Sequence, residues 1–207
     1  MTRSEYHRQI DYLMKEAEKN DSLIPWMREM CLTDIYFLGV YVLGRTDLDH
    51  IELPNGSKQY RDWLFDRCME VQEEPDGYID IWARDHYKST LITFLKTIQD
   101  ILIDPEITCC IYSYSSSAAT KFLKQIKLVL ESSEKLKQLF PDILFDDVTK
   151  PFWTDERGVA HKMVWSELGL RVKRQSNAKE NTVEASGLVI GQRTGGHYNL
   201  LIYDDVV

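Results

Sequence analysis

The feature that most constrains the fold of this chain is a strand-like run that leads through a polar turn into a helix. Residues 78–82 (Tyr-Ile-Asp-Ile-Trp) are mostly apolar, and residues 83–87 form the turn before Lys88. Apolar residues then recur at spacings of three and four, at Leu91, Leu95, Ile98 and Leu102. This spacing predicts a helix with one buried stripe, and a strand followed directly by a helix favours an α/β fold.

A tight turn from a strand into a helix directs unpaired backbone N–H groups and the positive end of the helix dipole at one point. Lys88 adds a positive charge there, and Ser89 adds a hydroxyl that can reach a magnesium ion. The pattern therefore predicts a site for the phosphates of a nucleotide. An ordinary strand–helix unit with a chance Lys-Ser pair is the alternative.

The turn departs from the common phosphate-binding loop, Gly-x-x-x-x-Gly-Lys-Ser/Thr. Trp82 and Tyr87 stand where that loop has its two glycines. If the residue before the lysine needs a left-handed backbone, Tyr87 costs roughly 1–2 kcal/mol that glycine would not.

The last apolar run of the chain ends in two carboxylates. Residues 199–203 read as a parallel strand buried on both faces, and Asp204 and Asp205 follow it. The carboxyl end of such a strand is where α/β sheets place ligands. Adjacent acids repel each other unless a cation lies nearby, and a magnesium-bound nucleotide held by Lys88 and Ser89 would supply that charge. A strand that ends in a solvated acidic turn is the alternative.

This arrangement assigns a different role to each acid. We expect Asp204 to hold the magnesium ion, directly or through water, and Asp205 to orient the attacking water. The prediction requires Lys88 and the two acids to converge in space.

Composition supports a folded chain without a general affinity for nucleic acid. The 207 residues are 43% hydrophobic, which is enough for a core, and their net charge of −8 leaves any DNA contact to local basic patches. The four cysteines lack metal-ligand spacing, so we expect reduced core thiols. The longest apolar run, residues 35–43, is shorter than the ~20 residues of a membrane helix. We therefore expect a soluble protein.

The sequence indicates two regions. Residues 1–56 are expected to form a helical segment, with helices over 4–19 and after a cap at Asp21-Ser22, and the turn at 54–56 marks its end. Residues 57–207 are expected to form the core. It should begin with an amphipathic helix over 59–71, with Tyr60, Trp63, Leu64 and Cys68 or Met69 inward.

Further along, residues 107–112 predict a buried strand, and Ser115 to Ser117 offer cap hydroxyls for a helix. That helix carries Phe122, Ile126 and Val129 on its expected inner side, with Lys121, Lys124 and Lys127 on another face. The lysines suit either a phosphate backbone or solvent. A hairpin is expected around 154–158, and further strands at 168–172 and 182–185.

Two more segments stand out before the final strand. The densest basic patch comprises Arg171, Lys173, Arg174 and Lys179. Four of the ten glycines fall in residues 187–196, a run that we interpret as a loop with Arg193 at its centre.

These residues together resemble the ATPase region of the large subunit of tailed-phage terminases, which are DNA-packaging motors. The resemblance lies in the atypical loop with an arginine four places before the lysine (residues 83–90), in the strand and helix of 111–130, and in the glycine-rich approach to Asp204-Asp205. It covers roughly residues 30–207.

The resemblance implies a RecA-like P-loop NTPase fold, with a mostly parallel sheet and helices on both faces, that binds ATP and Mg²⁺. The residues implied in nucleotide binding are Arg84, Asp85, His86, Tyr87, Lys88, Ser89 and Thr90, with Gln59 and Tyr60 as candidates for the adenine. Ser89 and Asp204 are implied as metal ligands. Arg84, Arg193 and Asp205 are implied in catalysis, with Arg193 acting on the ATP of a neighbouring subunit.

The implied activity is ATP hydrolysis that drives double-stranded DNA into a viral procapsid, in the cytoplasm of an infected bacterial cell. The implied partners are DNA, the portal, the small terminase subunit and further copies in a ring. Members of the family continue with a coupling strand and a nuclease domain, so we expect this chain to be an N-terminal fragment. Another P-loop motor such as a helicase-like ATPase, or a non-catalytic nucleotide-binding or assembly fragment, are the alternatives.

Overall fold

The computed structural model describes residues 1–17, 19, 21–73, 82–83, 86–176, 178–190 and 195–206. Contacts divide the chain into two compact units, Met1–Ile81 and Trp82–Val207. The boundary expected after residue 56 falls inside the first unit, between its two short strands. No helix in the described part of the chain combines the length and apolar character needed to cross a membrane.

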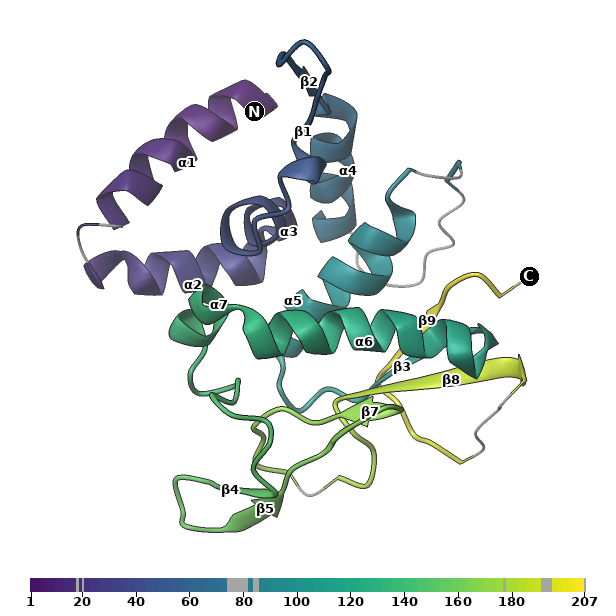
Figure 1. The fold of residues 1–207 in the computed structure, drawn as a ribbon. Coiled ribbons are helices and arrows are strands. Elements are labelled where there is room, and N and C mark those ends of the chain that lie inside the picture. Colours follow the sequence, from purple (N-terminus) through teal and green to yellow (C-terminus); the bar gives the residue numbers. More distant parts are fainter. Residues whose placement is uncertain are drawn as a thin grey trace. The chain divides into compact units, whose positions relative to one another are not determined.

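The first unit is mainly helical (Figure 1). Its elements are α1 (Arg3–Ala17), η1 (Asp21–Leu23), α2 (Ile24–Thr33), α3 (Ile35–Phe37), η2 (Leu38–Val42), η3 (Thr46–Leu48), β1 (His50–Glu52), β2 (Lys58–Tyr60) and α4 (Asp62–Glu73). Aromatic rings fill its core: the centroid of Phe65 lies 5.0 Å from that of Tyr36 and 5.3 Å from that of Tyr6. All three side chains are buried, so they join α1, α3 and α4.

Three expectations for this unit were wrong in detail. The helix predicted from residue 59 begins at Asp62, because residues 58–60 pair with β1 as strand β2. Tyr60 and Trp63 are 52% and 43% exposed, whereas Leu64 and Cys68 are buried as expected. The cap of α2 is Leu23, which makes no side-chain cap hydrogen bond, and Asp21-Ser22 lie one turn earlier in η1.

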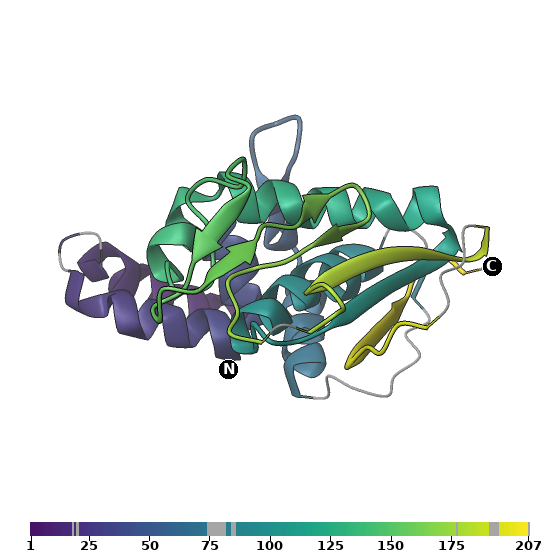
Figure 2. The same cartoon turned by 90° about the horizontal axis from the view of Figure 1, so that it is seen from below.

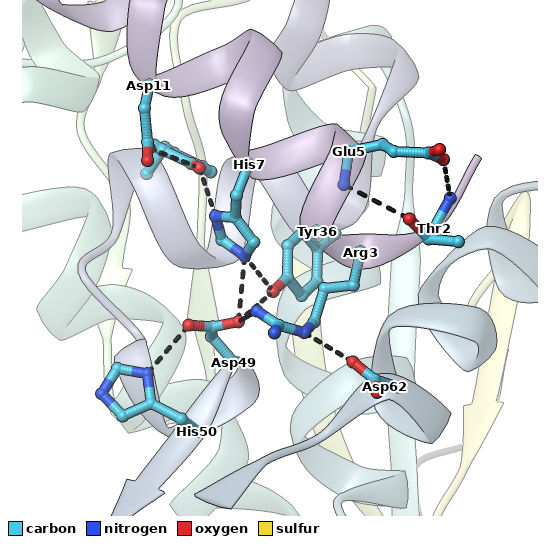
Figure 3. Close-up of polar contacts among 10 residues, drawn as sticks. Thr2, Arg3, Glu5, His7, Asp11, Tyr36, Asp49, His50 and Asp62 are labelled. Carbon is cyan, nitrogen blue, oxygen red and sulfur yellow. Dashed lines mark hydrogen bonds and ion pairs between the residues drawn. The ribbon is translucent and has the colours of Figure 1, made fainter. Parts of the chain in front are cut away.

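A buried polar cluster centred on Asp49 ties α1 to the rest of this unit (Figure 3). Asp49 Oδ1 accepts hydrogen bonds from Arg3 Nη1 at 2.5 Å and Tyr36 OH at 2.8 Å, and lies 2.9 Å from His7 Nε2. Its Oδ2 lies 2.8 Å from His50 Nδ1. Burial by itself would raise the pKa of Asp49, but the hydrogen bonds from His50 and Tyr36 and the charges of His7 and Arg3 outweigh it and lower the pKa to about 2.

The second unit is an α/β unit with a mixed sheet of order β6-β7-β8-β3-β9. Its elements are η4 (Ser89–Lys96), α5 (Thr97–Ile103), β3 (Cys109–Ser115), α6 (Ser116–Ser132), α7 (Glu134–Leu139), β4 (Phe152–Thr154), β5 (Ala160–Lys162), β6 (Trp165–Ser166), β7 (Gly169–Leu170), β8 (Val183–Ile190) and β9 (Leu200–Tyr203). The three strands β8, β3 and β9 are parallel, and β6 and β7 are antiparallel. The mixed α/β class agrees with the sequence prediction.

The strand β3 lies between β8 and β9, and hydrogen bonds at both ends fix its register with β9. At the start, the Thr108 backbone N–H and hydroxyl donate to Asn199 Oδ1 at 3.1 and 2.8 Å. At the end, Asp204 N donates to the Tyr112 carbonyl at 2.8 Å. The carboxyl ends of these strands are therefore held level.

The described helices of this unit lie on one face of the parallel strands (Figures 1 and 2). On that face Ile111 and its neighbours in the sheet, Ala185 and Ile202, are all 9% exposed or less. On the opposite face Leu201 and Tyr203 are 45% and 54% exposed. We expected the last strand to be buried on both faces and helices to cover both faces of the sheet. Within the described residues, neither expectation is met.

The buried stripe of the helix after Lys88 is confirmed, since Leu91, Leu95, Ile98 and Leu102 are at most 2% exposed. Ser115 caps α6 as predicted, accepting a hydrogen bond from Ala118 N at 3.2 Å. The buried side of α6 is rotated from the predicted one: Ala119, Leu123, Ile126 and Leu130 are buried. All four cysteines are buried, as expected.

The expected hairpin is formed by β4 and β5, with Gly158 at φ 78° in its turn.

The residues of the predicted basic patch are not all on the surface. Arg174 is 3% exposed and its Nη2 donates to the carbonyls of Ala178, at 3.0 Å, and Glu180. Lys173 Nζ donates to the Pro141 carbonyl at 2.7 Å. Residues 187–190 of the loop expected at 187–196 belong to β8 instead, and residues 191–194 lie outside the described part of the chain.

Asp49→Asn is expected to destabilise the docking of α1 by about 2 kcal/mol, the free energy that corresponds to the lowered pKa. A carboxyl with a lowered folded-state pKa contributes stability above its unfolded pKa, and this is lost as the pH falls toward 2. Amide hydrogen exchange of α1 peptides at neutral pH measures the effect.

The matched control is Asp47→Asn, which removes a 39% exposed carboxylate paired with Arg45 and should change stability by less than about 1 kcal/mol. Equal exchange of α1 in the two variants would contradict a structural role for Asp49.

Candidate nucleotide site

The helix that follows residue 87 begins with an unusual backbone. Tyr87 has φ 64°, in the left-handed region, and its carbonyl accepts the first helical hydrogen bond from Leu91 N at 2.8 Å. Lys88 is the residue before η4 and has helical torsions. The chain therefore turns through a left-handed residue immediately before the helix end that carries Lys88 and Ser89. The sequence analysis expected strain if the residue before the lysine had a left-handed backbone, and Tyr87 has one.

The acids at the end of β9 are fixed by β3. Tyr114 N donates to the Asp205 carbonyl at 3.0 Å, and Ser113 Oγ donates to the same carbonyl at 3.2 Å. Asp205 has φ 49°, so the backbone turns sharply at this residue. Asp204 is 1% exposed, whereas the side chain of Asp205 is 75% exposed. The two adjacent carboxylates thus occupy different environments.

Lys88 and the two acids converge, although 116 positions separate Lys88 from Asp204. Lys88 Nζ lies 3.1 Å from Asp204 Oδ1 and 4.0 Å from Asp205 Oδ1. The side chain of Lys88 is 32% exposed, so the ammonium has access to solvent on one side. This is the convergence that the sequence prediction required.

The second oxygen of Asp204 has a partner that sequence reasoning missed. Thr93 Oγ1 donates to Asp204 Oδ2 at 2.7 Å, and Thr93 is 1% exposed. A signal for it exists in the sequence, because Ser89, Thr93 and Thr97 recur at a spacing of four. Residues four apart share one side of a helix, so a line of hydroxyls along this helix was detectable.

Asp204 Oδ1 is buried and accepts no hydrogen bond from the described residues, although the Lys88 ammonium lies within ion-pair distance. A short distance without a hydrogen bond means that the angle between the ammonium and this oxygen is unfavourable for one. A carboxylate oxygen left in this state fits a hard cation, and Mg²⁺ takes oxygen ligands and commonly only one or two carboxylates. Within the described residues no group of three or more His, Cys, Asp or Glu is arranged as a metal cage.

The other predicted site residues are distributed unevenly. Ser89 and Thr90 are half-buried at the start of η4, and His86 is exposed just before it. Arg84, Asp85 and Arg193 lie outside the described residues. Gln59 and Tyr60 belong to the other unit, where the Tyr60 ring lies 4.0 Å from the Arg3 guanidinium.

Comparison of the chain with protein-family models, with characterised proteins and with solved structures gave no match.

The strain at Tyr87 can be measured by comparing Tyr87→Gly with Tyr87→Ala. Both variants remove the ring, but only alanine keeps the Cβ that disfavours φ 64°. The glycine variant should be the more stable of the two by about 1 kcal/mol, after its greater unfolded-state entropy is subtracted. Urea unfolding followed by circular dichroism gives the difference. A glycine variant less stable than the alanine variant would exclude strain at this residue.

Proposed function

We propose that this protein binds magnesium-ATP and hydrolyses it, with the nucleotide phosphates at the Lys88 end of η4. The observation that carries the proposal is the 3.1 Å approach of Lys88 Nζ to the buried Asp204 carboxylate. A lysine at a helix start and an acid at the end of a parallel strand are the two parts that phosphoryl-transfer sites of the P-loop class need. On this proposal the second unit is an ASCE-type P-loop domain.

Each residue then has a separate task. The backbone N–H groups at the start of η4 and the Lys88 ammonium bind the phosphates, which requires Lys88 to turn from Asp204 toward the nucleotide. Asp204 and the Ser89 hydroxyl would hold the magnesium ion. Bound magnesium would neutralise charge that develops on the phosphate oxygens. Asp205 is solvent-accessible and lies beside Asp204, where its carboxylate can orient a water molecule for attack.

The resemblance to terminase large subunits supports a more specific proposal, that hydrolysis drives double-stranded DNA into a procapsid. Arg84 and Arg193 would then act at the γ-phosphate, the latter on a neighbouring subunit. ATP turnover that rises with portal and DNA together, without strand separation, would distinguish this activity from that of a helicase-like motor.

Lys88→Ala is expected to weaken ATP binding roughly 10–100-fold, because a charge-assisted hydrogen bond contributes about 1.5–3 kcal/mol. Titration calorimetry with a slowly hydrolysed ATP analogue and Mg²⁺ measures the affinity, and a thermal melt confirms that the variant is folded.

Lys121→Ala is the control, because Lys121 is an exposed lysine of α6 and its loss should leave the affinity unchanged. Wild-type affinity in Lys88→Ala would remove the basis of the proposed site. Tight binding without turnover in the wild type would instead favour a non-catalytic nucleotide-binding protein.

A further inference from the structure

We infer that Thr93 is a positioning residue for the magnesium ligand Asp204, acting through its hydroxyl on one carboxylate oxygen. This inference rests on the proposed function and adds to it a residue outside the phosphate loop. The hydroxyl comes from the second turn of η4, and the carboxylate from the end of β9, 111 residues further along the chain. The contact thus joins the helix that begins at the phosphates to the strand that carries the metal acid.

The geometry divides the two oxygens of Asp204 between two tasks. Oδ2 accepts the 2.7 Å hydrogen bond from Thr93, while Oδ1 lies toward the Lys88 ammonium and accepts no hydrogen bond in the described part of the chain. A carboxylate held by one oxygen cannot rotate freely about its Cβ–Cγ bond, so the other oxygen keeps a fixed direction. Such outer-shell hydrogen bonds orient ligands and strengthen metal binding in many sites.

A threonine within a helix usually has a nearer partner. Its hydroxyl can return a hydrogen bond to a carbonyl four residues earlier, as Thr97 does to the Thr93 carbonyl at 2.8 Å. Thr93 instead reaches across to β9. Both threonines are 1% exposed, so they differ in the partner of the hydroxyl and not in their burial. This makes Thr97 a matched reference for the loss of a buried hydroxyl from the same helix.

The test is the magnesium dependence of nucleotide affinity in the full 207-residue chain. Titration calorimetry with a slowly hydrolysed ATP analogue is run with Mg²⁺ and again with EDTA, and the ratio of the two affinities is the readout. Thr93→Val keeps the shape of the side chain but not its donor. We expect the ratio of the two affinities to fall about 10–100-fold in this variant, which is the usual cost of removing an outer-shell partner. The affinity measured in EDTA should change little.

Two controls separate positioning from folding. Thr93→Ser keeps the donor and should restore the ratio, whereas Thr97→Val removes a buried hydroxyl that does not touch Asp204 and should keep it. Thr93→Ala, which also lacks the donor but adds no bulk, replaces the valine variant if that variant fails to fold. An unchanged ratio in a folded donor-less variant, or a loss of equal size in Thr97→Val, overturns the role of Thr93.

Failure of this inference is distinguishable from failure of the proposed function. If Thr93 has no such role but the site binds nucleotide, Lys88→Ala still weakens binding with and without Mg²⁺, while the Thr93 variants behave like the wild type. If the wild type binds no nucleotide under either condition, the proposed function is wrong and the role of Thr93 falls with it.

Discussion

The ion pair between the half-exposed Lys88 and the buried carboxylate of Asp204 is the interaction on which the candidate site depends. Burying an isolated carboxylate that is 1% exposed would cost several kcal/mol, so Asp204 needs a cation beside it. Lys88 supplies that cation from the start of η4, 3.1 Å away. The start of one helix and the end of one strand are therefore coupled electrostatically. A cation that replaced Lys88 beside Asp204 would lie at this same junction of helix and strand.

The local backbone makes this pairing possible. The left-handed residue Tyr87 turns the chain immediately before the helix, and the second left-handed residue, Asp205, turns it immediately after Asp204. Both are non-glycine residues, and both lie next to the charged pair. Strained torsions of this kind persist where the surrounding structure holds them, and they concentrate at functional sites. Here the hydrogen bonds of Asp205 with Tyr114 and Ser113 provide that restraint on the strand side.

Sequence patterns predicted the local features and the convergence, but not the direction of individual side chains. The apolar stripe from Leu91 to Leu102 follows from helical periodicity alone. The partner of Asp204 could not be read in the same way: the spacing of Ser89, Thr93 and Thr97 indicates a line of hydroxyls, but which of them reaches Asp204 depends on tertiary packing. The basic run around Arg174 was misleading for a similar reason: composition counts charges, whereas this guanidinium turns inward to backbone carbonyls. The continuous apolar run of β9 likewise overstated its burial, since Leu201 and Tyr203 lie on the uncovered face.

Two of the buried acids in the described part of the chain, Asp49 and Asp204, show how a structural carboxylate differs from a candidate functional one. Both oxygens of Asp49 are partnered, by Arg3, Tyr36 and the two histidines, and its pKa is lowered to about 2. Such a group is fully used in holding α1, and it has no remaining capacity for a ligand. Asp204 is buried as deeply, yet one of its oxygens has a firm hydrogen bond and the other has none with any residue that the structure describes. Folding alone does not require an unsatisfied buried oxygen, because a second hydroxyl or amide could have filled the place. Asp204 thus differs from Asp49 in that, among the described residues, its Oδ1 is contacted by the Lys88 ammonium without a hydrogen bond, and this difference is the reason why we propose Asp204 as the metal ligand.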